Sequence, residues 1–73
     1  MKTKTELTFP SELKEEAIIC ELCKKFDIIV NIVEASFSTN TGWAILILDG
    51  KSSEIKKAIG FLKEKGVTVD ENK

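Results

Sequence analysis

Residues 28–37 read Ile-Ile-Val-Asn-Ile-Val-Glu-Ala-Ser-Phe, and residues 43–48 read Trp-Ala-Ile-Leu-Ile-Leu. β-Branched and aromatic side chains dominate both segments, which predicts two strands. The stretch between them, Ser38-Thr39-Asn40-Thr41-Gly42, has the small polar residues and the glycine that are typical of a turn. The two segments are therefore expected to form a hairpin at the centre of a sheet.

Both faces of this hairpin are apolar, which is unusual for a sheet with one face in water. Alternation places Asn31 on the same side of its strand as four apolar residues, Ile29, Val33, Ala35 and Phe37. In the second strand, the side carrying Trp43, Ile45 and Ile47 is as apolar as the opposite side. Because helices can cover only one face, the other is expected to expose an apolar patch, and such patches mark interaction sites. A partner chain, a second copy or a small ligand is expected to cover it.

The segments on either side of the hairpin alternate between strand and helix. Residues 3–9 alternate with period two and predict a strand. A helix is expected next, with an apolar stripe of Ile18, Ile19, Leu22, Cys23 and Phe26. After the hairpin, Ser52 or Ser53 is suited to cap a second helix and Gly66 to end it. Residues 67–69 predict a last short strand.

The order strand, helix, strand, strand, helix, strand is the ferredoxin-like βαββαβ arrangement of the α+β class. It predicts a four-stranded antiparallel sheet with both helices on one face. The 73 residues are expected to form a single domain, residues 1–73, with a core over residues 3–69 and a polar tail over residues 70–73.

Composition argues against several classes of function. The net charge is −1 and all eleven basic residues are Lys, whereas nucleic-acid binders usually carry a basic surplus that includes Arg. No apolar run reaches the ~18 residues of a membrane helix, so no membrane insertion is expected. The lysines near the N-terminus precede no apolar segment, so no signal peptide is expected and the cytoplasm is the expected location.

The residues available for chemistry are few. The chain has no His, which removes the commonest general base and the commonest metal ligand, and its carboxylates show no catalytic pairing. Cys20-Glu21-Leu22-Cys23 is a C-x-x-C motif placed one or two turns inside the first predicted helix. With Cys23 in the apolar stripe and no second pair to complete a zinc site, both thiols are predicted to pack as small hydrophobes. The sequence thus predicts no enzyme, no metal and no cofactor, although a metal or thiol carrier using both cysteines stays open.

Three stretches together resemble the NIL domain family. They are residues 26–35, which include Asn31-Ile32-Val33 at the position of the eponymous Asn-Ile-Leu motif, residues 7–10, Leu-Thr-Phe-Pro, and residues 58–67 with an aromatic at Phe61. The likeness covers residues 5–69. This sequence departs from the family at Val33, which replaces Leu, and at Ala17, where many members have Pro.

The resemblance implies a regulatory domain similar to ACT-type amino-acid sensors. Such domains lie at the C-terminus of ATP-binding subunits of methionine importers, where they dimerise and bind methionine, and also beside ferredoxin modules. The family's motif Asn, implicated in ligand binding, maps to Asn31. The chain has neither a Walker motif nor the four-cysteine run of a ferredoxin, so no ATPase activity and no iron–sulfur cluster are expected.

The predicted function is therefore a small ligand-binding module that senses an amino acid such as methionine at a homodimer interface. Asn31 would be the polar anchor, and Ile29, Val33, Ala35 and Phe37 would supply an apolar pocket. The alternative is a purely structural module that dimerises or docks a transporter, ferredoxin or sulfur-metabolism partner.

Overall fold

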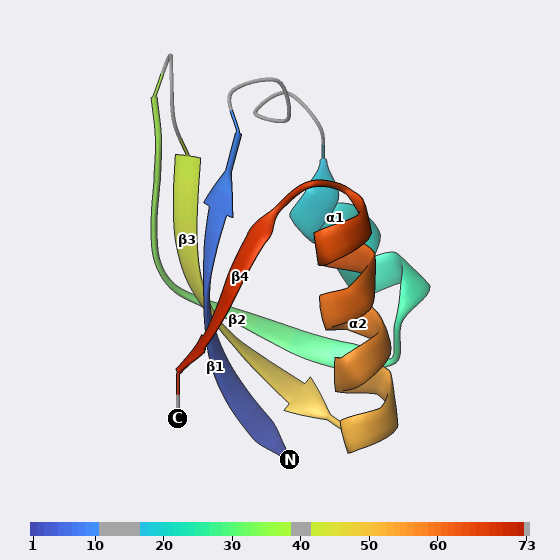
Figure 1. The fold of residues 1–73 in the computed structure, drawn as a ribbon. Helices are drawn as coiled ribbons and strands as arrows, with labels where there is room; N and C mark the ends of the chain where they lie inside the picture. Colours follow the sequence, from blue (N-terminus) through green and yellow to red (C-terminus); the bar gives the residue numbers. More distant parts are fainter. Residues whose placement is uncertain (11–16, 39–41, 73) are drawn as a thin grey trace.

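The computed structural model describes residues 1–10, 17–38 and 42–72. Over these residues the chain follows the predicted order of strands and helices, and Figure 1 shows the path. The elements are β1 (Lys2–Phe9), α1 (Ile18–Lys25), β2 (Ile28–Phe37), β3 (Gly42–Gly50), α2 (Ser52–Glu64) and β4 (Thr68–Asn72). The predicted ferredoxin-like α+β fold is confirmed.

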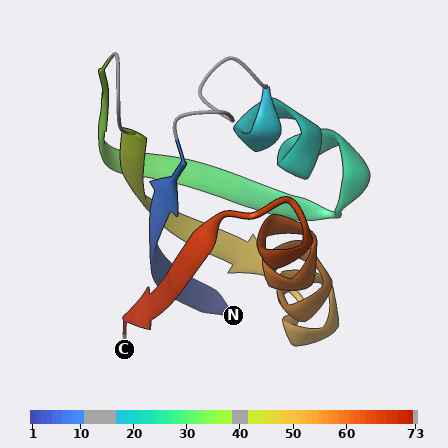
Figure 2. The same cartoon turned by 45° about the horizontal axis from the view of Figure 1, so that its top comes forward.

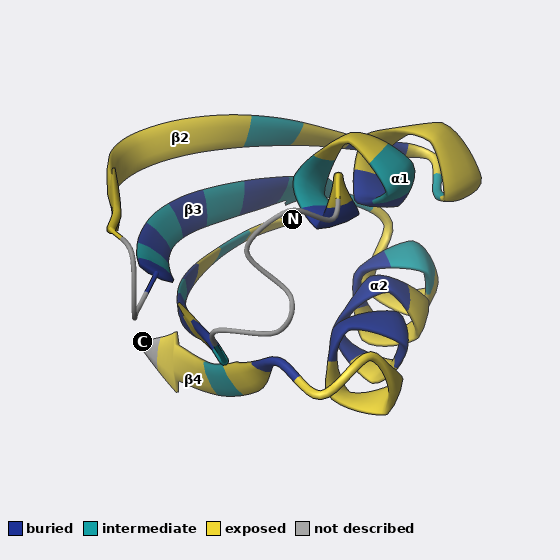
Figure 3. Ribbon diagram, turned by 90° about the horizontal axis from the view of Figure 1, so that it is seen from above, coloured by how far each residue is buried: buried dark blue, intermediate teal, exposed yellow. Residues whose placement is uncertain are grey.

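All described strands join one antiparallel sheet in the order β2-β3-β1-β4. The hairpin partner β3 lies between β2 and β1, so β2 and β4 are the two edges. Both helices pack on the same face of the sheet, as Figures 2 and 3 show from two directions. The opposite face carries no helix among the described residues.

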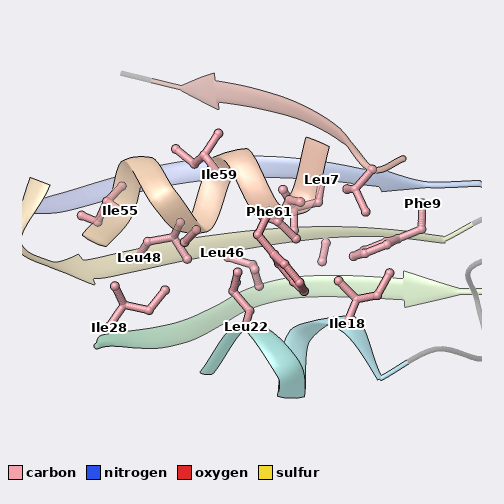
Figure 4. Close-up of a cluster of buried hydrophobic side chains, with 14 residues drawn as sticks. Leu7, Phe9, Ile18, Leu22, Ile28, Leu46, Leu48, Ile55, Ile59 and Phe61 are labelled. Atoms are coloured by element: carbon pink, nitrogen blue, oxygen red, sulfur yellow. The ribbon is translucent and has the colours of Figure 1, made fainter. Parts of the chain in front are cut away.

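The core lies between the helices and the sheet (Figure 4). Its members are apolar residues on the helix-facing side of the strands and on the inner faces of both helices: Leu7, Phe9, Ile18, Leu22, Ile28, Ala44, Leu46, Leu48, Ile55, Ala58, Ile59, Phe61, Leu62 and Val67. Thr5 is also buried, and its hydroxyl donates a 3.4 Å hydrogen bond to the carbonyl oxygen of Leu46. This bond removes the cost of an unpaired polar group in the core.

Several boundaries differ from the prediction. β4 runs from Thr68 to Asn72, so residues 70–72 of the predicted polar tail pair with β1 instead. Lys51, not Ser52 or Ser53, is the N-cap residue of α2. Gly66 has φ 97°, a conformation that L side chains rarely adopt. The predicted role of this glycine in ending α2 is therefore confirmed. The predicted turn over residues 39–41 lies outside the described residues.

Neither helix in the part of the chain that the structure describes combines the length and the hydrophobicity that crossing a bilayer requires.

Candidate functional site

A β-bulge interrupts the strand that carries the predicted site. Ile32 of β2 pairs with Leu46, but Glu34 pairs with the next residue of β3, Ile45, so Val33 is an extra residue without a partner on β3. An extra residue reverses the facing of every side chain beyond it. Before Val33 the odd-numbered residues of β2 face away from the helices, and beyond Val33 the even-numbered residues do.

The bulge corrects the predicted pocket. Asn31 and Ile29 pair with Ile47 and Asp49, on the face without helices. Beyond the bulge, Ala35 pairs with the buried Ala44, so it faces the helix side. Phe37 lies on that side too, and its ring centroid is 5.5 Å from that of the buried Phe9. Ala35 and Phe37 therefore do not share the face of Asn31 and Ile29, because strict alternation fails at Val33.

The face without helices, here called the open face, is centred on three half-buried residues of β3: Trp43, Ile45 and Ile47. They alternate with Ala44, Leu46 and Leu48, which are buried under the helices. Ile45 and Ile47 lie on one face, as the alternation of β3 predicted. The stripe is long and apolar, and nothing among the described residues covers it.

Polar residues flank this stripe in cross-strand rows. One row holds Ile47 between Asn31 of β2 and Lys4 of β1. Neighbouring strands are spaced about 4.7–4.9 Å apart, so Asn31 and Lys4 are separated by about 10 Å across Ile47. The row therefore combines an amide, an apolar platform and a cation.

The next row of the open face is acidic. Ile45 is flanked by Glu34 of β2 and Glu6 of β1, and Glu6 is in turn paired with Asp70 of β4. Like charges placed opposite each other destabilise an isolated sheet. A positively charged group over this row would remove the repulsion between the carboxylates.

Several large apolar side chains of β2 are strongly exposed. Ile29 is 72% exposed, Ile32 53%, Val33 50% and Phe37 51%. β2 is also a ten-residue edge strand whose only charged residue is Glu34. Natural edge strands usually carry charges or are short, since an unprotected edge can pair with another chain. The exposure of β2 thus favours contact with a partner.

The two cysteines are not packed as predicted. Both are free and exposed, and Cys20 lies in the first turn of α1 instead of deeper in the helix. The buried residues of α1 are Ile18 and Leu22. At 100° per residue, Cys23 is turned about 100° from Leu22 and about 140° from Ile18 around the helix. Its side chain is exposed, so its place in the predicted apolar stripe was wrong.

Sequence patterns alone did not combine Lys4, Glu6 and Asp70 with the open face. Their alternation along β1 and β4 places them on the polar side of each strand, but only the register brings them beside Ile45 and Ile47. The three residues belong to two strands that are distant from the hairpin in sequence. No local signal in the sequence identifies that neighbourhood.

Comparison with known proteins agrees with this architecture. Residues 3–71, nearly the whole chain, match the NIL domain family. This chain belongs to the NIL domain family. A solved structure, the C-terminal domain of an ABC transporter ATP-binding protein from Enterococcus faecalis, superimposes with a TM-score of 0.81 and 20% identity. The superposition covers 94% of this NIL domain and 81% of the Enterococcus faecalis chain, which shows a shared fold.

Relatives of this NIL domain include two kinds of protein. The methionine import ATP-binding protein MetN 2 of Bacillus licheniformis is 29% identical over 69 residues, which are 89% of this chain. An uncharacterised protein of Synechocystis sp. is 32% identical over 65 residues, 86% of this chain and 67% of its own length. The chain spans only 20% of the length of the MetN 2 protein.

Proposed function

We propose that this NIL domain is a regulatory module, not a catalyst, that binds a small amino acid such as methionine at a homodimer interface. The observation that carries the proposal is the composition of the open face, where Asn31, Ile47 and Lys4 lie in one row next to a row of carboxylates. Family membership and the methionine-import relatives support the choice of ligand.

The open face offers a partner for each part of such a ligand. The Lys4 ammonium suits an α-carboxylate, and Glu6 or Glu34 suits an α-ammonium group, because charge-assisted hydrogen bonds are the strongest of their kind. Ile45 and Ile47 provide apolar surface for a thioether arm. Asn31 can donate and accept hydrogen bonds at the edge of that surface. Of the predicted pocket, Ile29 lies on the same face as Asn31, whereas Ala35 and Phe37 lie on the opposite face.

A second copy on the open face would complete the site. A ligand on an open sheet is exposed to water on one side, whereas small-molecule sites bury most of their ligand. The open face is also suited to a copy of itself, because it carries an acidic row next to the lysines Lys2 and Lys4. A two-fold axis between these rows would bring lysines of one copy over carboxylates of the other and cover both isoleucine stripes.

The Asn31→Ala variant tests the ligand site. Loss of one hydrogen bond to a charged ligand group costs about 1.5–3 kcal/mol, which is about ten- to a hundred-fold in affinity. We expect calorimetry to show that L-methionine binds the variant more weakly by this factor. Ser36→Ala is the matched control, because Ser36 lies on the same strand and face, opposite Trp43, away from Lys4. Its affinity should equal that of the wild type.

A structural module without a ligand is the second candidate, and the exposed apolar edge of β2 favours it. If the protein forms a stable homodimer but neither the wild type nor any variant gives a heat of binding, the structural function is correct and amino-acid sensing is not. Equal affinity of the wild type and Asn31→Ala would keep a sensor but exclude Asn31 from its site.

A further inference from the structure

The exposed thiols of Cys20 and Cys23 form a pair on the outer side of α1, away from the open face. Residues three apart on a helix are neighbours on its surface, so the two side chains extend side by side. The core side of α1 carries the buried Ile18 and Leu22 and the partly buried Ile19, whereas Cys20 and Cys23 are both exposed. Cys is among the most frequently buried residue types, so two exposed free thiols on one helix face need an explanation other than packing.

The spacing of the pair suits an ion held between the sulfurs better than a disulfide. Residues three apart on a helix have Cβ atoms roughly 5–6 Å apart, whereas a disulfide requires about 3.5–4.5 Å. One ion with two metal–sulfur bonds of about 2.3 Å each, the length of a zinc–thiolate bond, separates the sulfurs by up to about 4.6 Å. Helical Cys20 and Cys23 can reach that separation by side-chain rotation alone.

The number of available donors selects the class of ion. The structure's described part has no group of three or more His, Cys, Asp or Glu residues that could hold a metal ion, and the whole chain has no His. Zinc requires four ligands in a structural site. Copper(I) is selected by soft thiolates and is satisfied by two of them. We propose that Cys20 and Cys23 bind one copper(I)-class ion as a dithiolate on the outer face of α1.

Charge balance supports this assignment. Two thiols that bind one monovalent cation release two protons, and the resulting dithiolate complex carries one negative charge. Lys24 follows Cys20 by four residues, so its ammonium group lies next to that sulfur on the helix surface. Lys25 lies on another side of α1, with its ammonium group 4.9 Å from the centroid of the Phe61 ring. The complex would thus form beside one cation, that of Lys24, without any residue of the amino-acid site.

The test is an anaerobic titration of the reduced protein with copper(I) in competition with the chromogenic chelator bicinchoninate. We expect the wild type to withdraw one copper(I) per chain and to release two protons per ion. Cys20→Ser and Cys23→Ser should each lose this binding while circular dichroism shows an unchanged fold, because both side chains are exposed. X-ray absorption should show two sulfur neighbours around the copper.

The matched control keeps two thiols but separates them. In the double variant Cys23→Ser with Lys25→Cys, the cysteines lie about 140° apart around the helix, so one ion cannot bridge them. Equal copper(I) binding by this variant, or by either single serine variant, would overturn the proposal. Three or more sulfur neighbours, or no copper(I) withdrawn by the wild type, would overturn it as well. Methionine calorimetry on the variant lacking both cysteines should match the wild type, so this test is independent of the amino-acid site.

Discussion

Gly42 is the point where the hairpin, β1 and two aromatic rings meet. It pairs with both Phe9 and Phe37, whose rings lie 5.5 Å apart between centroids. A Cβ atom at Gly42 would lie 2.5 Å and 2.8 Å from two atoms of the Phe37 ring. Such distances are too short for carbon atoms, so a side chain here would displace the Phe37 ring from Phe9.

The Gly42→Ala variant should therefore be less stable than the wild type. Aromatic pairs contribute about 0.5–1.5 kcal/mol beyond their buried area, and we expect a loss of that order because the half-exposed Phe37 ring can turn away. Urea unfolding followed by circular dichroism measures it. Gly60→Ala is the control, since a Cβ there meets nothing within 4 Å. That change in the interior of α2 should stabilise the domain by about 0.5–1 kcal/mol, and a loss of stability there would contradict this account.

At the scale of elements, Glu54 connects the first turn of α2 to the turn between α1 and β2. Its carboxylate oxygen Oε1 accepts a 3.0 Å hydrogen bond from the backbone N–H of Asp27, and Oε2 pairs with Lys57 at 3.4 Å. The hydrogen bond from Asp27 is the main reason that the pKa of Glu54 lies below its ordinary value of 4.5, and Lys57 lowers the pKa further. Two segments that are distant in sequence are joined by this one side chain.

The lowered pKa of Glu54 makes the domain's stability dependent on pH. As the pH falls through 4.5, Glu54 becomes protonated in the unfolded chain while it is still ionised in the folded domain. The stabilisation from Glu54 is therefore complete above that pH, and it is lost as the pH falls through the lower pKa of the folded domain. We expect wild type to exceed Glu54→Gln in stability at pH 7, and the difference to vanish in acid. Urea unfolding at several pH values checks this.

The Lys57→Gln variant separates the two causes of the shift in the pKa of Glu54. It removes the ion pair but keeps the hydrogen bond from Asp27, which has the larger effect. The difference in stability between Lys57→Gln and Glu54→Gln should therefore still depend on pH. A difference between wild type and Glu54→Gln that stays constant from neutral to acid pH would show that the carboxylate has no special role.

At the scale of the whole molecule, the two faces of β3 differ in what they contact. Leu46 is fully buried under the helices, whereas its neighbour Ile47 is half-buried on the open face. The proposed homodimer covers the open face, so the same change at these adjacent positions should have different results.

Ile47→Lys should yield a folded monomer, because a charge on the open face opposes dimerisation without entering the core. Leu46→Lys should unfold the domain, since deletion of core packing and burial of a charge cost roughly 3–5 kcal/mol or more. Size-exclusion chromatography with light scattering gives the oligomeric state, and circular dichroism gives the fold. A wild type that stays monomeric up to millimolar concentration would count against the homodimer.

The element order, the exact bounds of β2 and the glycine that follows α2 could be predicted because each depends on local chemistry. β-Branched runs, apolar helical stripes and a glycine at positive φ are set by neighbours along the chain. The sites were harder. The prediction that Ala35 and Phe37 share a face with Asn31 was wrong, because a bulge at Val33 is a property of two paired strands. The exposure of Cys23 was missed because its spacing of four from Ile19 fits an apolar stripe, although Ile19 packs against the core and Cys23 is exposed.

The sequence by itself determined the βαββαβ order, the membership of the NIL family and the excess of apolar residues in the central hairpin. These features depend on residue types and on short periodicities, which operate over a few residues. Only the tertiary structure decided which residues share a face. The β2–β3 register shift left Asn31 and Ile29 on the open face, and pairing of β1 with β3 and β4 brought Lys4, Glu6 and Asp70 to the same surface. That neighbourhood depends on pairings between distant residues, such as Glu6 with Asp70, which are 64 positions apart. Such pairings are selected by burial of the whole core and not by any local pattern.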